Sequence, residues 1–192
     1  LGDQNALIYD SPVTGIVEHW TYQTMLDEVV ALAAVYRNLG IGKGDRIIIY
    51  MPMIPQAVFA MLASARIGAV HSVVFGGFAA SELATRITDS AAKLVVSASC
   101  GIEAGRTIAY KPLLDAAIAI SQHKPEHCLV FQREALKAEL QADRDIDFAA
   151  AVTSAKQQGV EIACTPVLAT DPLYILYTSG TTGQPKGVVR DN

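Results

Sequence analysis

The spacing of apolar positions changes from one segment of the chain to the next, and this change predicts alternating strands and helices. Apolar residues at helical spacing predict helices at 55–68, 80–89 and 111–121. Strands that are apolar on both faces and alternate with helices indicate an α/β fold, with largely parallel sheets flanked by helices. Short, nearly continuous apolar runs predict the strands themselves at 46–50, 69–75, 93–98, 128–132 and 173–178.

The amino-terminal region has a different pattern, in which two short apolar segments surround a turn. Residues 6–9 and 17–20 flank the sequence Ser-Pro-Val-Thr-Gly, which predicts a β-hairpin. Thr21 then stands where a helix-capping hydroxyl is expected, and the apolar spacing that follows predicts a helix closed by Gly40. The hairpin and this helix therefore precede the alternating part of the chain.

Two later segments carry weaker patterns. Residues 133–159 are rich in charge and in alanine, which predicts an exposed helix with a loop near residues 143–147. Residues 163–172 predict a connector, because Pro166 and Pro172 interrupt regular hydrogen bonding. The connector leads directly into the last predicted strand.

Composition supports one folded core and excludes some partners. The chain has 192 residues, of which 51% are hydrophobic and 18% charged, with a formal net charge of -4. This is enough apolar material for one sizeable core, and the charge balance argues against nucleic-acid binding. The richest apolar region, 57–78, is interrupted by Arg66 and His71, so it predicts buried elements rather than a membrane span. We expect His71 to be a core residue with its hydrogen bonds satisfied.

The cysteines indicate the compartment of the protein. Cys100, Cys128 and Cys164 are widely separated and odd in number, which favours neither a disulfide framework nor a zinc site. This usage is typical of the reducing cytoplasm. His123 and His127 approach a metal-binding spacing beside Cys128, but the strand pattern that follows favours a buried cysteine. We therefore assign no metal ligand in this chain.

The segment with the clearest chemistry is residues 177–187, Tyr-Thr-Ser-Gly-Thr-Thr-Gly-Gln-Pro-Lys-Gly. It combines three glycines, four serine or threonine hydroxyls and one lysine directly after an apolar strand pattern. Glycines let backbone N–H groups approach phosphate oxygens, hydroxyls donate further hydrogen bonds, and lysine supplies a positive charge. The segment indicates a polyphosphate-binding loop, although the same composition also occurs in surface turns between strands.

The spacing inside this loop argues against the Walker type of phosphate loop. A Walker loop places serine or threonine after its glycine-lysine pair and opens a helix. Here Pro185 precedes Lys186 and Gly187 follows it. The β-branched residues after Gly187 predict a strand, whereas a helix beginning at Lys186 would favour a P-loop kinase or GTPase.

The order of residues 177–187 resembles the phosphate-loop signature of the adenylate-forming enzymes, which include acyl-CoA synthetases, luciferases and the adenylation domains of peptide synthetases. Residues 44–52, 60–63 and 66–78 resemble the short-chain acyl-CoA synthetases, the acetyl and propionyl branch. The tail 186–192 is more similar to propionyl-CoA than to acetyl-CoA synthetases. The resemblance implies that residues 1–192 are an incomplete amino-terminal, AMP-binding domain without the carboxyl-terminal domain.

The resemblance implies an ATP-dependent, AMP-forming ligation of a short-chain carboxylic acid, preferably propionate, to coenzyme A through an acyl-adenylate. The partners would be these small molecules, with Mg²⁺ accompanying ATP, and no nucleic acid or membrane is expected. By itself the chain is expected to be inactive. Two alternatives stay open, namely an acetyl-CoA synthetase and a non-catalytic phosphate-binding fragment.

The resemblance also implies roles for individual residues. Lys186 would be catalytic, neutralising charge on the phosphates or on departing pyrophosphate. Gly105 and Arg106 would contact coenzyme A, with Arg106 reaching its 3′-phosphate, but Glu103 stands where the acetyl enzymes commonly carry arginine. The alternative for Arg106 is an exposed arginine at the approach to a helix, and nearby Lys111 is expected only at the surface. The residues expected to hold the ATP phosphates are Thr178, Ser179, Gly180, Thr181, Thr182 and Gly183.

Overall fold

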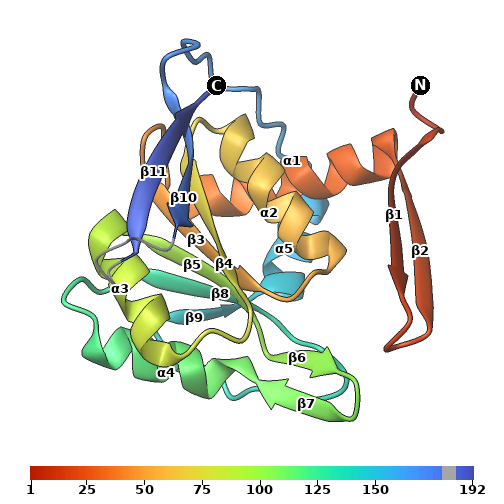
Figure 1. The fold of residues 1–192 in the computed structure, drawn as a ribbon. Helices are drawn as coiled ribbons and strands as arrows, with labels where there is room; N and C mark the ends of the chain where they lie inside the picture. The colour runs from red at the N-terminus through yellow and green to blue at the C-terminus, as the bar shows by residue number, and fades with distance from the viewer. Residues whose placement is uncertain (179–184) are drawn as a thin grey trace.

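The apolar runs of the sequence form the strands of one large sheet. The computed structural model describes residues 1–178 and 185–192. Figure 1 shows helices on both sides of this central sheet, with the amino-terminal hairpin set to one side. The described strands form one seven-stranded sheet and two separate two-stranded sheets. The α/β fold class expected from the sequence is thereby confirmed.

The seven-stranded sheet has the order β11-β10-β4-β3-β5-β8-β9. Neighbouring strands are parallel everywhere except between β10 and β11, which pair antiparallel. Parallel neighbours are expected where helical crossovers connect the strands. The strands are β3 (Arg46–Met51), β4 (Val70–Phe75), β5 (Leu94–Ala98), β8 (His127–Phe131), β9 (Asp145–Asp147), β10 (Pro172–Thr178) and β11 (Lys186–Asp191).

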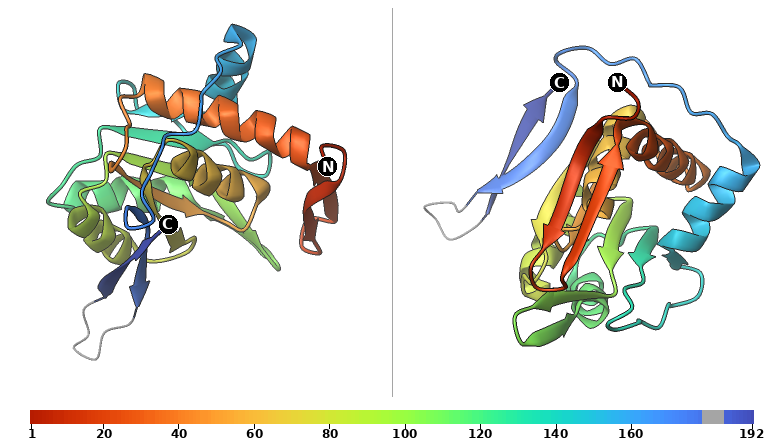
Figure 2. Two further views of the ribbon diagram at one scale, coloured as in Figure 1. Left: turned by 90° about the horizontal axis from the view of Figure 1, so that it is seen from above. Right: turned by 90° about the vertical axis from the view of Figure 1, so that its right-hand side faces the viewer.

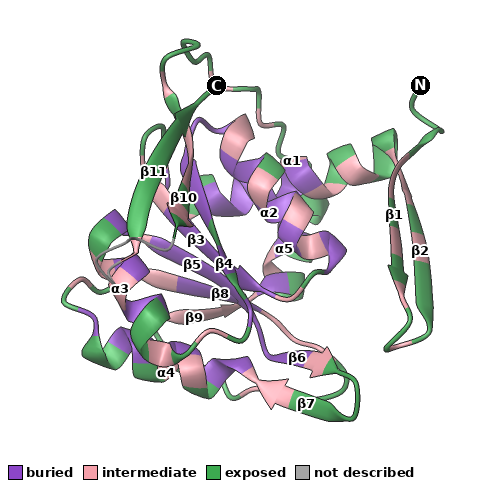
Figure 3. Ribbon diagram, viewed as in Figure 1, coloured by how far each residue is buried: buried purple, intermediate pink, exposed green. Residues whose placement is uncertain are grey.

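Helices cover both faces of the sheet because the central strands are apolar on both faces. Ile47 and Ile49 of β3 join one buried cluster, while Ile48 and Tyr50 join the other. Burying such a side chain stabilises the fold by roughly 1.5–3 kcal/mol, and Figure 3 shows the buried residues gathered along these strands. The first cluster includes residues of α1 (Tyr22–Asn38), α2 (Pro55–Arg66) and α5 (Phe148–Gln158), and the second includes residues of α3 (Ala80–Ser90) and α4 (Tyr110–Ile120). Of the helices in the described residues, none combines the length and the apolar character needed to cross a membrane.

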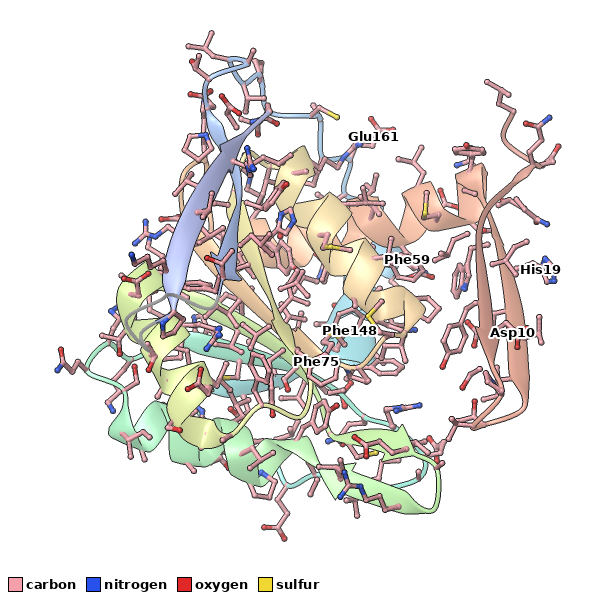
Figure 4. All side chains as sticks on the ribbon, viewed as in Figure 1. Asp10, His19, Phe59, Phe75, Phe148 and Glu161 are labelled. Atoms are coloured by element: carbon pink, nitrogen blue, oxygen red, sulfur yellow. The ribbon has the colours of Figure 1, made fainter. Side chains whose placement is uncertain are left out.

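The amino-terminal hairpin, β1 (Asn5–Ser11) and β2 (Ile16–Thr21), leads directly into α1. The Thr21 hydroxyl accepts a hydrogen bond from the Thr24 amide at 3.1 Å, and the Thr24 hydroxyl accepts one from the Thr21 amide at 2.9 Å. This reciprocal pair confirms Thr21 as the residue that caps α1. Trp20 meets Phe59 of α2 edge-on, with ring centroids 4.9 Å apart, so the hairpin packs against α2. Figure 4 labels Phe59 on this helix.

Four elements differ from the sequence prediction. Residues 133–144, all of which the structure describes, form no helix, and of the residues expected as a loop Asp145–Asp147 form β9 beside β8. The predicted helix begins only at α5, which buries Phe148, Val152 and Ala155 and leaves most of its other residues exposed. β6 (Cys100–Glu103) and β7 (Arg106–Ala109) form a hairpin that the apolar pattern does not indicate. Short polar strands depend on pairing with a partner, which local sequence does not reveal.

Lys111 is buried between α4 and β9, so its expected surface position is wrong. Its Nζ lies 2.6 Å from Asp115 Oδ2 and 2.9 Å from Asp145 Oδ2. Arg144 Nε donates to Asp145 Oδ1 at 2.7 Å, and the Asp145 side chain is 0% exposed. Burial by itself would raise the pKa of Asp145, but hydrogen bonds from Arg144 and Lys111 hold that pKa below its ordinary value. Two cations and two carboxylates thus neutralise one another and join α4 to the edge strand.

We predict that Lys111→Ala destabilises the protein markedly, because it leaves the buried Asp145 carboxylate with Arg144 as its remaining cation. The free energy of unfolding at pH 7, measured by denaturant titration, should fall by about 3 kcal/mol. Lys137→Ala is the matched control, because Lys137 pairs with Glu134 through side chains that are 54% and 91% exposed. That substitution should change the free energy of unfolding by less than about 1 kcal/mol. Equal losses in the two variants would contradict a stabilising role for the buried network.

Candidate active site

The candidate phosphate loop is carried by the hairpin of β10 and β11 at one edge of the sheet. Thr178 pairs with Lys186, and these two residues are the last pair before residues 179–184. Both are exposed, so the Thr178 hydroxyl and the Lys186 ammonium are accessible to a ligand. The other residues expected to hold phosphate lie outside the described residues: Ser179, Gly180, Thr181, Thr182 and Gly183.

The element that follows the loop excludes the Walker alternative. Lys186–Asp191 is a strand, β11, and it pairs antiparallel with β10. In a P-loop kinase or GTPase a helix would open at the lysine. The strand predicted after Gly187 is therefore confirmed, and the kinase or GTPase interpretation is wrong.

The hairpin is attached to the rest of the sheet near the start of β10. Tyr174 pairs with His71 in the parallel ladder between β10 and β4. The Ser72 hydroxyl donates to the Ile175 carbonyl oxygen at 2.9 Å. Because β10 runs parallel to β4, residue 178 leaves the sheet on the side where the parallel strands have their carboxyl ends. In open α/β sheets ligands bind outside these carboxyl ends.

His71 is buried as expected, but it is not the satisfied core histidine that the sequence suggested. Its Nδ1 is buried and has no hydrogen-bond partner among the described residues. The ring instead packs against Tyr174, with ring centroids 5.8 Å apart. Burial lowers the pKa of His71 to about 4, so the ring is neutral at physiological pH.

The candidate coenzyme A residues lie at the tip of the β6–β7 hairpin. Gly105 has φ of +79°, a conformation that favours glycine, and it turns the chain between Glu103 and Arg106. Arg106 donates to Glu103 Oε2 from Nη2 at 2.6 Å and from Nε at 2.8 Å. The Arg106 side chain is 69% exposed, so solvent and ligands reach it even while it pairs with Glu103. Arg106 opens β7, which leads directly into α4 at Tyr110, so the alternative of an exposed arginine at the approach to a helix stays open.

A pocket of about 670 Å³ lies between this tip and the turn of the amino-terminal hairpin. Pro12 and Val13 of that turn form one wall, and residues 102–107 form the other. Figure 2 shows the two hairpins approaching each other from distant parts of the sequence. No local sequence signal connects Pro12 or Val13 with the candidate coenzyme A site, because the two segments meet only in the tertiary structure.

The residues considered for metal binding have other contacts. His123 Nε2 lies 2.9 Å from the Ala92 carbonyl oxygen. Cys128 is buried in β8, and this burial raises the pKa of its thiol to about 12. Within residues 1–178 and 185–192, no group of three His, Cys, Asp or Glu side chains is arranged to hold a metal ion.

These features define the class of protein. A glycine-rich loop joins β10 to the antiparallel edge strand β11 where the parallel strands of the sheet have their carboxyl ends. This arrangement indicates a phosphate-loop α/β protein outside the Walker class. A model of the AMP-binding enzyme family matches residues 2–192. The chain therefore belongs to the AMP-binding enzymes.

Similar proteins include short-chain acyl-CoA synthetases. An uncharacterized protein of Pseudomonas aeruginosa is 56% identical over 191 residues, which are 100% of this chain and 30% of that protein. Acyl-CoA synthetase short-chain family member 3, mitochondrial, of Rattus norvegicus is 53% identical over 98% of this chain and 27% of its own length. Propionate–CoA ligase of Escherichia coli is 46% identical over 97% of this chain and 29% of its own length. The chain thus spans about 30% of the length of these relatives.

We predict that His71 makes stability depend on pH in the weakly acidic range. Its pKa is about 4 in the folded protein, whereas the ordinary pKa of a histidine side chain is 6.5, so the unfolded chain takes up a proton first as the pH falls. The contribution is fully present above pH 6.5 and is lost toward pH 4. Over this range wild type should lose on the order of 3 kcal/mol more than His71→Met, because one pKa unit corresponds to about 1.4 kcal/mol.

Unfolding titrations at half-unit pH steps between 7 and 4.5 would measure this difference. His19→Gln is the control, because His19 is exposed on β2 (Figure 4). It should retain the wild-type pH dependence. If His71→Met also retained it, the buried imidazole would not be the responsible group.

Proposed function

We propose that the full-length protein is an AMP-forming ligase that joins a short-chain carboxylic acid, preferably propionate, to coenzyme A through an acyl-adenylate. The main support is the family match over residues 2–192, together with the loop sequence 177–187 on the edge hairpin. In this proposal residues 1–192 belong to the large AMP-binding domain. The proposed substrates are the acid, ATP and coenzyme A.

The residues at the mouth of the loop suit the first half of this reaction. When a carboxylate attacks the α-phosphorus of ATP, negative charge develops on the departing pyrophosphate. The exposed Lys186 ammonium supplies a positive charge there, and the Thr178 hydroxyl beside it supplies a hydrogen-bond donor. The hydroxyls and backbone amides of residues 179–183 are proposed to bind the β- and γ-phosphates. Mg²⁺ is expected with ATP, but no described residue is proposed as its ligand.

The tip of the β6–β7 hairpin suits the second half of the reaction. Coenzyme A carries a 3′-phosphate, and an exposed guanidinium can bind phosphate through charge-assisted hydrogen bonds. Arg106 is exposed at the mouth of the pocket that includes Gly105. Glu103 already occupies two donors of Arg106, so a phosphate must compete with this carboxylate. We therefore propose that the Arg106 contact is weaker here than it would be without Glu103.

Propionate is preferred for two reasons. The tail 186–192 resembles propionyl-CoA synthetases, and one relative is a propionate–CoA ligase. An acetyl-CoA synthetase is the alternative within the same reaction class, and a phosphate-binding protein without catalysis is the alternative outside it. The cytoplasmic location expected from the cysteines stays a prediction, because the rat relative is named as a mitochondrial protein.

The experiment that tests the proposal is isotope exchange between pyrophosphate and ATP. The full-length protein should catalyse this exchange only when a short carboxylic acid is present, because adenylation must precede reversal. Catalytic efficiency should be higher with propionate than with acetate; the opposite order would favour the acetyl alternative. Exchange without any acid, or formation of ADP, would contradict an acyl-adenylate mechanism. A protein that binds ATP without exchange would fit the non-catalytic alternative.

We predict that Arg106→Ala raises the Michaelis constant for coenzyme A by about five- to thirtyfold, because a charge-assisted contact is lost. Acid-dependent pyrophosphate exchange should stay unchanged, because coenzyme A takes no part in that half-reaction. Glu103→Gln should act in the opposite direction and lower the same constant, because it releases the guanidinium. Both effects should shrink with dephospho-CoA, which lacks the 3′-phosphate. Equal effects on both thiols would indicate that Arg106 serves the hairpin alone.

A further inference from the structure

Beyond Lys186 itself, a contact from α3 reaches the loop end of the β10–β11 hairpin. The Tyr177 hydroxyl donates to Asp89 Oδ2 at 2.6 Å, and these residues are separated by 88 positions in sequence. Tyr177 immediately precedes Thr178 and is paired with Gly187, which immediately follows Lys186. A side chain of α3 is therefore bonded to the residue pair that adjoins Thr178 and Lys186.

The glycine at 187 makes room for this contact. A Cβ at Gly187 would lie 3.2 Å from Tyr177 Cε1 and 3.4 Å from Asp89 Oδ2, closer than side chains ordinarily pack. The Tyr177 ring thus lies close against the backbone of β11 on its way to α3. The loop motif ends in glycine at the position where a larger residue would crowd the Tyr177–Asp89 pair.

Arg86, one turn before Asp89 on α3, fixes the ring of Tyr177. Its guanidinium carbon lies 5.2 Å from the Tyr177 ring centroid and 4.9 Å from that of Phe78. The Arg86 side chain is only 8% exposed, and Nη1 donates to the Glu82 carboxylate at 2.9 Å. A cation held in this way attracts the face of an aromatic ring. Burial, and next the bond to Asp89, raise the pKa of Tyr177, so the hydroxyl keeps its proton.

The position of this contact matters because β10 is attached to β4 at residues farther from the loop. The parallel pairing with β4 is at Tyr174, and the Ser72 bond reaches Ile175 at the middle of β10, so both lie farther from the loop than Tyr177 does. The contact between Tyr177 and Asp89 restrains β10 next to the loop. An ammonium that must meet developing charge has to be placed accurately, since a displacement of about 1 Å can lower a rate on the order of a hundredfold.

We propose that Tyr177 and Asp89 are positioning residues that hold Lys186, through the strand pair Tyr177–Gly187, where it serves the adenylation half-reaction. This inference rests on the proposed function of the full-length protein. Neither residue need touch the substrates. Their effect should therefore depend on the presence of the Lys186 ammonium and should be confined to the step in which pyrophosphate leaves.

The test uses the full-length protein and follows the two half-reactions separately. Tyr177→Phe, which keeps the ring and removes the hydroxyl, should lower the rate constant of propionate-dependent pyrophosphate exchange by about tenfold. Asp89→Ala should have a similar effect, and Asp89→Asn a smaller one, because the amide oxygen still accepts the tyrosine hydrogen bond. Thioester formation from supplied propionyl-adenylate and coenzyme A should stay at the wild-type rate in all three variants.

A double-substitution cycle shows whether the pair acts through the lysine. In a Lys186→Ala background, adding Tyr177→Phe should lower exchange by less than about twofold, since coupled residues are not additive. Tyr174→Phe is the matched control, because Tyr174 lies on the same strand and packs its ring against His71. It should leave exchange at the wild-type rate.

The possible failures are distinguishable. Wild-type exchange in Tyr177→Phe would overturn the inference alone, and so would a tenfold loss that persists in the Lys186→Ala background. Equal loss of both half-reactions, accompanied by a lower melting temperature, would also overturn it and indicate a purely structural contact. If the unsubstituted protein showed no acid-dependent exchange, the proposed function would fail and the inference with it.

Discussion

The burial of β3 on both faces is the constraint on which the rest of the structure depends. Ile47 and Ile49 point into one cluster and Ile48 and Tyr50 into the other, so helices must cover both faces of the sheet. Strands connected by such helices run parallel, so their carboxyl ends lie on the same side of the sheet. Because β10 pairs with β4 in the same direction, its last residue, Thr178, lies on that side. The location of the loop therefore follows from the packing of the apolar core, although the loop itself is polar.

Buried charge connects the helices to the strands in two places. Lys111 and Arg144 neutralise Asp115 and Asp145 between α4 and the edge strand β9. Arg86 of α3 pairs with Glu82 and faces the rings of Phe78 and Tyr177. A buried ion pair adds little net stability compared with apolar packing, but a single arrangement satisfies its partners. The apolar clusters give most of the driving force, while these charges fix which helix residue meets which strand.

The elements that the sequence predicts well are those whose apolar pattern is continuous. The strands β3, β4, β5 and β8 and the helices α1 to α4 lie close to their expected bounds. Thr21 caps α1 as its residue type indicates. The elements missed are short and polar: β6, β7 and β9 exist because another segment pairs with them. The same reason explains the site. The loop motif indicates Thr178 and Lys186, whereas the role proposed for Asp89 depends on a contact between α3 and β10 that local sequence does not reveal. The nearest signal in the sequence is the spacing of Glu82, Arg86 and Asp89, which places three charges near one face of a helix.

The edge position of the loop hairpin has a consequence for how the site is held. β11 has β10 as its only sheet neighbour among the described strands, and each of its residues is exposed. An element with little burial and few backbone partners opens at lower free energy than a central strand does. Catalysis instead requires a fixed position for the cation, since a cation acts on developing charge only if it is already in place. Side-chain contacts such as Tyr177 to Asp89 can meet both demands, because they restrain the end of the hairpin that carries Lys186 without adding a further strand to cover the edge.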